Sequence, residues 1–256
     1  MTALPRVNIL GVGINAINLE QAVAEIDRWI QQRARHYVNV CNVHTVMECQ
    51  KDANLRQIVN RSGMSTPDGM PLVWLSRWHG YRDARRVYGP DLMLAICDRG
   101  QQAGYRHFFY GGAAGVASLL AERLKGRYPH LTVAGVHSPP FRPAGAMEDA
   151  DVLERIDASG ADIVWVGLGT PKQDYWVARH RDLLKAPVVI AIGAAFDFHA
   201  GLLRQAPRWM QRSGFEWLFR LIQEPRRLAY RYLVYNPLFI AKVALQLARA
   251  RVYRLE

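Results

Sequence analysis

The chain has 256 residues, of which 50% are hydrophobic, and it carries a formal net charge of +11 at pH 7. This length and composition suffice for a sizeable core, which excludes a largely disordered chain and leaves one large domain or one domain with an appendage. The three cysteines show neither a paired framework nor the spacing of a zinc site, which favours a reducing compartment.

The amino-terminal stretch predicts a first strand over Arg6 to Leu10. It lacks a basic segment followed by a long apolar run and a cleavage site, so we do not expect a signal peptide. A helix should begin at about Leu19, where Asn18 and Gln21 have the spacing of a capping box. These features predict a cytoplasmic protein.

Short apolar runs then alternate with segments of helical period, which is typical of a parallel sheet with crossover helices. Further strands are expected at His36–Val40, Arg106–Tyr110, Leu131–Val136, Asp162–Val166 and Val188–Ile192, and helices at Val116–Tyr128 and Asp174–Leu184. The fold class predicted is α/β, a Rossmann-like and mostly parallel sheet. Ligands of such sheets bind beyond the carboxyl ends of the strands, so the loops there are the candidate site.

Two polar loops come early in the chain. In Asn42-Val-His-Thr45 the side chains either contact a ligand or cap the helix that follows. In Pro67-Asp68-Gly69 the carboxylate either caps a turn or serves as a general base, the group needed when a hydroxyl attacks a carbon centre. The residues alone leave both choices open.

Two later loops are candidates for binding an anion. Gly111 and Gly112 lie in Tyr110-Gly-Gly-Ala-Ala-Gly115, where backbone N–H groups face a phosphate or a tight turn packs a helix on the sheet. Thr170-Pro-Lys-Gln173 has Thr at a helix N-cap and Pro at the first helical position, so capping explains Gln173, while Lys172 at the same helix start is a candidate to meet an anion.

A metal site is not expected. Asp149-Ala-Asp151 matches the DxD pattern of many metal-dependent glycosyltransferases, but it lies just before a helix, where carboxylates are favoured by the helix dipole. No histidine stands at ligand spacing from another, which also argues against a bound metal.

The composition changes near Gly201. Residues 201–256 hold 11 Lys or Arg and 3 Asp or Glu, a net charge of +8, together with many aromatic residues. We therefore expect a catalytic domain over 1–200 and a basic, aromatic, helical appendage over 201–256, with Pro225 ending one helix near Glu224 and starting another. No uninterrupted apolar run is long enough to cross a bilayer. The arginines and aromatic residues suit either a membrane interface or a solvated basic face with the aromatics in the core, and their clustering favours the interface.

Seven segments, taken together, resemble the WecG/TagA/CpsF family of glycosyltransferases over nearly the whole chain. They are CNVHTVMECQ, STPDGMPLVW, RVYGPDLM, FFYGGAAGV, IVWVGLGTPKQDYW, IAIGAAFDFHAG and RSGFEWLFRLIQEPRRLAYRYL. The resemblance implies an enzyme of cell-surface polysaccharide synthesis. It would transfer a sugar, with inversion and without metal or cofactor, from a UDP-sugar to an undecaprenyl-diphosphate-linked sugar at the inner face of the membrane.

The same resemblance assigns roles to residues. Asp68 falls on the catalytic base, Asn42 on a polar position of the donor pocket, and Arg86 and Gln173 on active-site positions. The predicted donor-binding residues are Asn42, Arg86 and Gln173 together with the loop residues Thr45, Gly111, Gly112 and Lys172. Arg220, Arg226, Arg227 and Arg231 fall in the appendage that reaches the membrane and the lipid diphosphate. Self-association is also implied. Val40 stands where the family often has Thr, so either Thr45 or His44 compensates or the donor sugar differs.

Two other classes remain as alternatives. A nicotinamide-dependent oxidoreductase would use the same fold, but the GxGxxG loop with an acidic residue about 20 positions later is missing. A non-catalytic module binding anionic lipid or nucleic acid would account for the basic tail alone. The resemblance favours the transferase and predicts no nucleic-acid partner.

Overall fold

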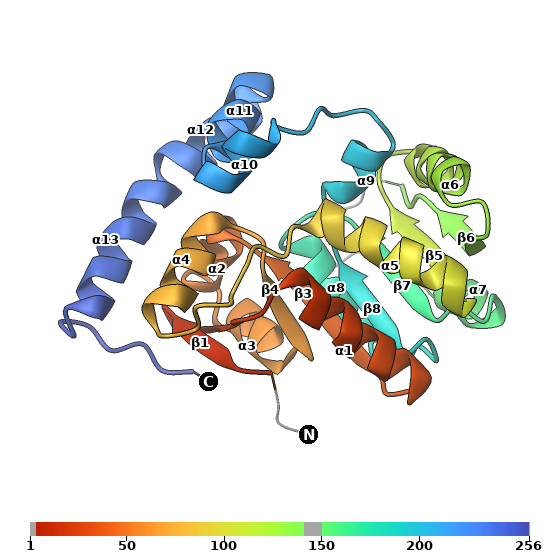
Figure 1. The fold of residues 1–256 in the computed structure, drawn as a ribbon, viewed down its shortest axis with the longest axis horizontal. Helices are drawn as coiled ribbons and strands as arrows, with labels where there is room; N and C mark the ends of the chain where they lie inside the picture. The colour runs from red at the N-terminus through yellow and green to blue at the C-terminus, as the bar shows by residue number, and fades with distance from the viewer. Residues whose placement is uncertain (1–3, 141–149, 256) are drawn as a thin grey trace.

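A computed structural model describes residues 4–140 and 150–255 of the chain (Figure 1). Its centre is a parallel sheet whose strands lie in the order β4-β3-β8-β7-β5-β6. These strands are β3 (His36–Cys41), β4 (Met64–Pro67), β5 (Arg106–Gly111), β6 (Thr132–His137), β7 (Ile163–Gly167) and β8 (Val188–Ala191). The α/β, Rossmann-like fold class is therefore confirmed, and five of these strands lie where the sequence predicts them.

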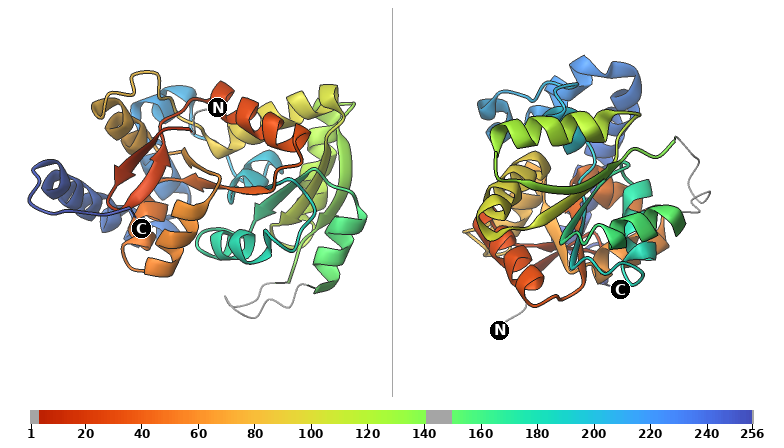
Figure 2. Two further views of the ribbon diagram at one scale, coloured as in Figure 1. Left: turned by 90° about the horizontal axis from the view of Figure 1, so that it is seen from below. Right: turned by 90° about the vertical axis from the view of Figure 1, so that its right-hand side faces the viewer.

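Helices cover both faces of the sheet (Figures 1 and 2). The helices of the first 200 residues are α1 (Leu19–Gln31), α2 (Val43–Cys49), α3 (Ala53–Arg61), α4 (Met70–Trp78), α5 (Gly89–Ala103), α6 (Val116–Arg127), α7 (Ala150–Ala158), α8 (Lys172–His180) and α9 (Ala195–His199). Helices α1, α5, α6 and α9 pack together against one face, whereas α3 and α8 contact each other on the opposite face. The predicted capping box of α1 is confirmed, with two reciprocal bonds of 3.0 Å between Asn18 and Gln21.

The first predicted strand is present but belongs to another sheet. β1 (Arg6–Ile9) pairs in antiparallel fashion with β2 (Val12–Asn15) in a separate hairpin. Both turn residues, Leu10 and Gly11, have positive φ, the conformation of the tight turns whose twist suits a hairpin. This local turn sends the chain back along β1 instead of through a crossover helix. The hairpin packs beside the edge strand β4.

Helix α8 differs from its expected form. It begins at Lys172 with Pro171 as N-cap, so the prediction of Thr170 as N-cap is wrong. Instead, Gln173 Oε1 accepts a 3.0 Å hydrogen bond from the Gly169 N–H, and its amide donates to Thr170 Oγ1 at 3.5 Å. The Gln173 side chain thus does the capping that the hydroxyl was expected to do.

The carboxyl group of Asp174 joins α8 to the sheet in the core. Its Oδ1 accepts a 2.6 Å hydrogen bond from Asn39 on β3, and burial raises its pKa from 3.8 to about 6. Because the folded pKa is the higher one, the free energy of unfolding falls as pH rises from about 4 to about 6. Burial of the charged carboxylate therefore costs stability at neutral pH.

Asp174→Asn removes this cost. Relative to the wild type, the variant should gain roughly 1 kcal/mol in free energy of unfolding between pH 5.0 and 7.5. Urea unfolding at both pH values measures the gain, with Asp98→Asn on the exposed surface of α5 as control. A difference between variant and wild type that does not change with pH would contradict the assignment.

After residue 201 the chain forms four helices along one side of the fold (Figure 1). They are α10 (Arg208–Ser213), α11 (Glu216–Gln223), α12 (Pro225–Leu233) and α13 (Tyr235–Leu247). The predicted break is confirmed, because α11 ends at Gln223 and Pro225 opens α12. Phe239 and Val243 of α13 pack into the hydrophobic cluster around the β1–β2 hairpin. The division at residue 200 stays a prediction, since these helices share a core and a cavity with the sheet domain.

Candidate active site

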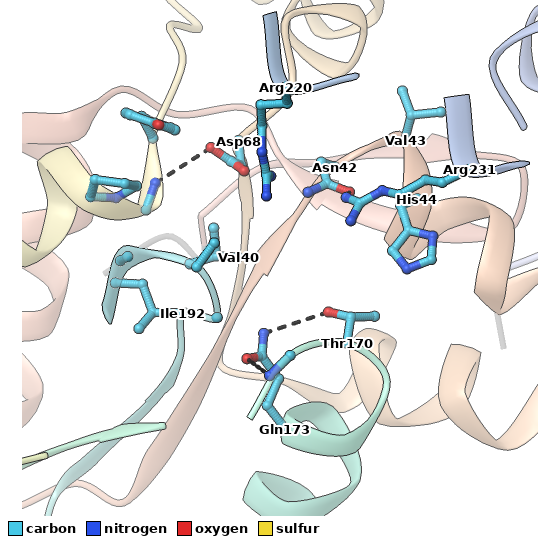
Figure 3. A pocket seen from close by; sticks show the side chains of 18 of the residues that line it. Val40, Asn42, Val43, His44, Asp68, Thr170, Gln173, Ile192, Arg220 and Arg231 are labelled. Atoms are coloured by element: carbon cyan, nitrogen blue, oxygen red, sulfur yellow. Dashed lines mark hydrogen bonds between the residues drawn. The ribbon is translucent and has the colours of Figure 1, made fainter. Parts of the chain in front are cut away.

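A cavity of about 1700 Å³ opens at the carboxyl ends of the parallel strands. It is lined by loops that follow β3, β4, β5, β7 and β8 and by residues of α4 and α10 to α13. In Figure 3, Asn42 and Asp68 lie near Arg220 and Arg231, with Thr170 and Gln173 across from them. Typical small-molecule pockets measure about 300–1,000 Å³, so this one has room for more than one ligand of that size. It lies where ligands of open α/β sheets bind.

Asp68 lines the cavity and comes directly after β4. Its backbone N–H donates to Cys41 O at 2.8 Å, which holds the turn against β3. Carboxyl Oδ1 accepts hydrogen bonds from the Gly89 N–H at 3.4 Å and from Arg86 Nη2 at 3.3 Å. The side chain is 15% exposed and lines the cavity. The geometry therefore leaves the carboxylate oriented and within reach of a ligand.

Burial raises the pKa of Asp68, and the nearby Glu216 carboxylate raises it further. Arg86, the Gly89 N–H and the Asn42 side chain act in the opposite direction by stabilising the charged form. The net direction is upward from 3.8, toward the operating range of a general base. A carboxylate of raised pKa in a cleft is a common mark of a functional site.

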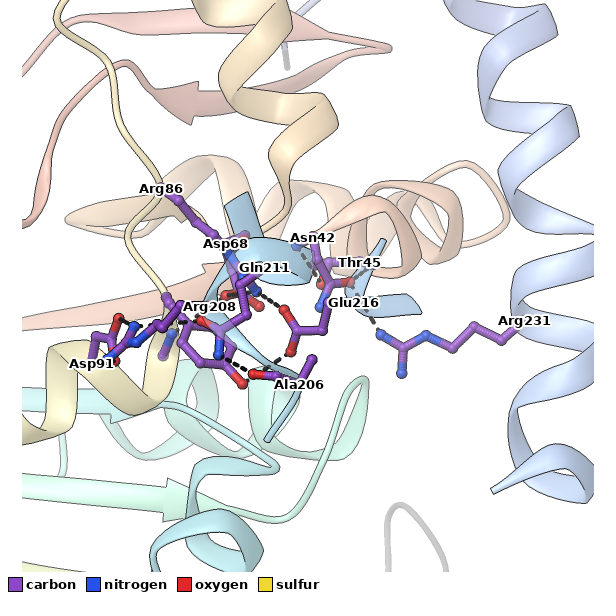
Figure 4. A network of polar contacts seen from close by, with 12 residues as sticks. Asn42, Thr45, Asp68, Arg86, Asp91, Ala206, Arg208, Gln211, Glu216 and Arg231 are labelled. Atoms are coloured by element: carbon purple, nitrogen blue, oxygen red, sulfur yellow. Dashed lines mark hydrogen bonds and ion pairs between the residues drawn. The ribbon is translucent and has the colours of Figure 1, made fainter. Parts of the chain in front are cut away.

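Glu216 was not among the residues that the sequence singled out. From the start of α11 it forms an ion pair of 2.6 Å with Arg86 Nη2 and accepts a 2.9 Å hydrogen bond from the Tyr88 hydroxyl (Figure 4). The Arg86 guanidinium also lies 4.0 Å from the centre of the Tyr88 ring. Arg86 thus bridges the two carboxylates of Asp68 and Glu216. The only signal in the sequence is that Glu216 is one of three acidic residues in a basic tail.

Asn42 and Thr45 belong to the start of α2. They form a capping box in which Asn42 Oδ1 accepts from the Thr45 N–H at 3.3 Å and Thr45 Oγ1 accepts from the Asn42 N–H at 3.4 Å. Asn42 lines the cavity, whereas Thr45 is buried beside it and does not. Of the two readings of Thr45, the geometry therefore favours capping.

Arg231 of α12 enters the cavity from the appendage side (Figures 3 and 4). Its Nη2 donates to Asn42 Oδ1 at 3.3 Å, and burial lowers its pKa to about 10. Within residues 4–140 and 150–255, no carboxylate lies at ion-pair distance from it, and Nε has no hydrogen-bond partner. A buried cation without a counter-ion is costly, so the site is suited to an anionic ligand.

The other appendage arginines differ in position. Arg220 lies 3.6 Å from Glu224 and is mostly buried, and Arg227 pairs with the same carboxylate from a more exposed position. Both line the cavity with Arg231. Arg226 is exposed and does not line it. The structure therefore brings three of the four predicted arginines to the site.

Loops after β5 and β7 form another wall of the cavity. Gly112, Lys172 and Gln173 line the cavity. Gly111 does not, and a Cβ at this position would lie 2.6 Å from the Gly167 backbone, which only glycine avoids. Close packing of β5 on β7 thus accounts for Gly111.

Val40 and Ile192 form an apolar floor at the ends of β3 and β8 (Figure 3). His44 lines the same cavity and stacks on Tyr235, with ring centroids 5.7 Å apart. Burial lowers the pKa of His44 to about 3, so its imidazole is neutral at physiological pH. Of the two residues expected to compensate for Val40, only His44 faces the cavity.

The described residues also bear on metal binding and on insertion into a membrane. Asp149 of the DxD pattern lies outside the described residues, while Asp151 stands in the first turn of α7 and lines the cavity. Across residues 4–140 and 150–255, no cluster of three or more His, Cys, Asp or Glu side chains is placed to hold a metal ion. In the same part of the chain, no helix has the length and apolar character to span a bilayer.

Comparison with known proteins gives a consistent result. A relative in Bacillus spizizenii strain W23, an N-acetylglucosaminyldiphosphoundecaprenol N-acetyl-beta-D-mannosaminyltransferase, is 27% identical over 215 residues, which cover 84% of this chain and 81% of that protein. A protein of the same description in Bacillus subtilis strain 168 is 28% identical over 200 residues, or 78% of this chain and 76% of the relative. A model described as the glycosyl transferase WecG/TagA/CpsF family matches residues 7–253. The chain belongs to this family of glycosyltransferases.

Proposed function

We propose that the enzyme transfers a sugar from a UDP-sugar to a sugar linked to undecaprenyl diphosphate, with inversion at the anomeric carbon and without a metal ion. The donor is of the hexose, N-acetylmannosamine or uronic acid type. Support comes from the two relatives, whose names specify N-acetylmannosaminyl transfer to a diphosphoundecaprenol-linked acceptor. The observation that carries the proposal is the partly exposed Asp68 carboxylate of raised pKa in a cavity lined by arginines.

Asp68 acts as the general base in this mechanism. It takes the proton from the attacking hydroxyl of the acceptor, and the oxygen forms a bond to the anomeric carbon of the donor. The bond from that carbon to UDP breaks on the opposite face, and UDP leaves with the electron pair. One displacement of this kind inverts the anomeric configuration.

The leaving diphosphate needs cations and N–H donors that are already in place. We assign this role to Arg231, with Lys172 and the backbone at Gly112, whereas Arg220 and Arg227 hold the diphosphate of the lipid-linked acceptor. Asn42 and Gln173 orient the donor sugar, while Thr45 and Gly111 hold the loops that present these groups. Val40 makes the sugar subsite less polar than the family's usual threonine would, which bears on the choice of donor.

The proposed location is the inner face of the cytoplasmic membrane, with the appendage toward the lipid. Large apolar side chains of α10 to α12 are exposed, among them Trp209, Ile222, Tyr230 and Leu233. Together with the arginines, these suit an interface between water and anionic lipid. Self-association stays a prediction.

A donor panel tests the proposal. UDP release is measured with UDP-hexoses, UDP-N-acetylhexosamines and UDP-uronic acids, an undecaprenyl-diphosphate-linked N-acetylglucosamine acceptor, and EDTA present or absent. We expect turnover with one donor class, unchanged by EDTA, and a product of inverted configuration by NMR. Silence across the panel from a folded enzyme would overturn the proposal, and loss in EDTA would overturn its metal-independent part.

Glu216, which is ion-paired with Arg86, should influence the pKa of the general base Asp68. Glu216→Gln removes the negative charge that raises the pKa of Asp68, so that pKa falls. Since Asp68 must be deprotonated to act, the acid limb of the kcat/KM profile should move to lower pH, and kcat should fall roughly tenfold because a weaker base remains.

Asp91→Asn is the matched control for this variant. It removes another ion pair between the appendage and the sheet domain, Arg208 to Asp91 at 2.7 Å, which does not line the cavity. Its acid limb should coincide with that of the wild type. If both variants shift the limb equally, Glu216 acts only by docking the appendage.

A further inference from the structure

The cavity continues beyond Asp68 and the arginines into an apolar groove between α4 and α13. On one side it is lined by Trp74, Leu75 and Trp78, and on the other by Ile240, Ala244 and Leu247. We call these six residues the α4/α13 groove. Residues 240, 244 and 247 follow the i, i+4, i+7 spacing of one helix face, and 74 and 78 share a face of α4. Two apolar stripes therefore line one cavity.

Several side chains of the groove remain exposed. Trp74, Trp78 and Ile240 keep 49%, 75% and 67% of their surface accessible, although buried Phe239 and Val243 fix α13 to the core. A contiguous exposed apolar surface of this kind marks a binding site in soluble proteins. The cavity residues that α4 and α13 contribute include Asn236 but no charged side chain.

The polarity of the cavity changes along its length. Arg220 and Arg227 line the cavity from α11 and α12, whereas the side chains that line it from α13, past Asn236, are apolar. A ligand that matches both parts has a diphosphate at one end and a hydrocarbon chain at the other. The acceptor of the proposed reaction has this composition, because its diphosphate is esterified directly to a polyprenol.

We propose that the α4/α13 groove binds the isoprenoid units of the acceptor lipid nearest to its diphosphate. This inference rests on the proposed function for the identity of the acceptor. The groove would guide the chain from the arginines toward the open end at Trp78 and Leu247. A flat bilayer fits less well, because the two apolar stripes line opposite sides of one cavity and do not form a single outer face.

Two alanines of α13 provide a matched test. Ala244 lines the groove, whereas Ala241, on the same helix and also exposed, does not line the cavity. Ala244→Trp should fill the groove, and Ala241→Trp adds the same side chain elsewhere. Both are assayed in detergent micelles with two acceptors that carry the same sugar diphosphate, one on an undecaprenyl chain and one on a short alkyl chain.

We expect Ala244→Trp to raise KM for the undecaprenyl acceptor at least about tenfold, the equivalent of losing the burial of one or two methylene groups. KM for the short-chain acceptor should not change, and Ala241→Trp should match the wild type with both. An unchanged KM for the long-chain acceptor, or an equal rise for both acceptors, would overturn the proposal. The proposal would also be overturned if Ala244→Trp left KM unaltered but abolished binding to phosphatidylglycerol vesicles or changed the oligomeric state. The groove would then face a bilayer or a second copy of the chain.

A binding measurement separates this inference from the proposed function. Fluorescence anisotropy of a labelled farnesyl diphosphate reports occupancy of the groove without any transfer. Binding of the probe by the wild type but not by Ala244→Trp, with no turnover from any donor, would support the groove assignment and contradict the proposed reaction. Normal turnover with equal binding of the probe by both proteins would support the reaction and contradict the groove assignment.

Discussion

Replacing Asp68 by Asn is expected to lower kcat by about 10²–10⁴-fold, the usual contribution of a positioned general base. The amide keeps an oxygen that can accept from the Gly89 N–H, so the turn after β4 should persist. Donor binding should change little, because the arginines and the loops after β5 and β7 are untouched. UDP release and UDP affinity, measured on the same preparations, separate these effects.

Asp197 supplies the comparison for this variant. Its carboxyl group lines the same cavity, and burial raises its pKa too, but it does not contact Arg86. Asp197→Asn should therefore cost less than about tenfold in kcat if Asp68 alone takes the proton. The reverse pattern, with Asp197→Asn inactive and Asp68→Asn active, would move the base to Asp197.

The features that the sequence predicts correctly depend on residues that are close together in the chain. The capping box at Asn18 and the break at Pro225 depend on residues within one helical turn, and both are confirmed. The alternation of apolar runs and helical segments was enough to place five strands of the sheet. Since the ends of parallel strands share one edge, the loops after the predicted strands were expected to form the site, and Asn42 and Gln173 from two of these loops line the cavity.

Contacts between distant segments could not be predicted. Glu216 reaches Arg86 across 130 residues of sequence, and nothing near either residue specifies that pairing. The sequence does not predict the strand β4, because Ser65, Thr66 and Pro67 are unusual in a buried strand. In the structure the distant Asn15 satisfies Ser65, since its Oδ1 accepts from the Ser65 N–H at 2.8 Å. The docking of the appendage onto the sheet domain determines which charged side chains of the appendage line the site.

Arg231 is expected to have the second largest effect. Arg231→Met keeps the length of the side chain but removes a cation that has no carboxylate at ion-pair distance within the described residues. The affinity for UDP should fall about 10²-fold, within the range found when one member of a buried charge pair is removed. Without ligand, the variant should melt at a higher temperature, because burial of the unpaired charge, seen in its pKa of about 10, no longer costs stability.

Arg226→Met on the same helix is the control, since Arg226 is exposed and outside the cavity. It should bind UDP as the wild type does and melt at the same temperature. Titration calorimetry with UDP and melting curves without ligand measure both quantities. If Arg231→Met binds UDP normally but raises KM for the lipid-linked acceptor, then Arg231 meets the acceptor's diphosphate instead of the donor's. If neither changes, the buried cation serves only to hold Asn42 and the start of α2, and the diphosphate must be bound by Arg220 and Arg227.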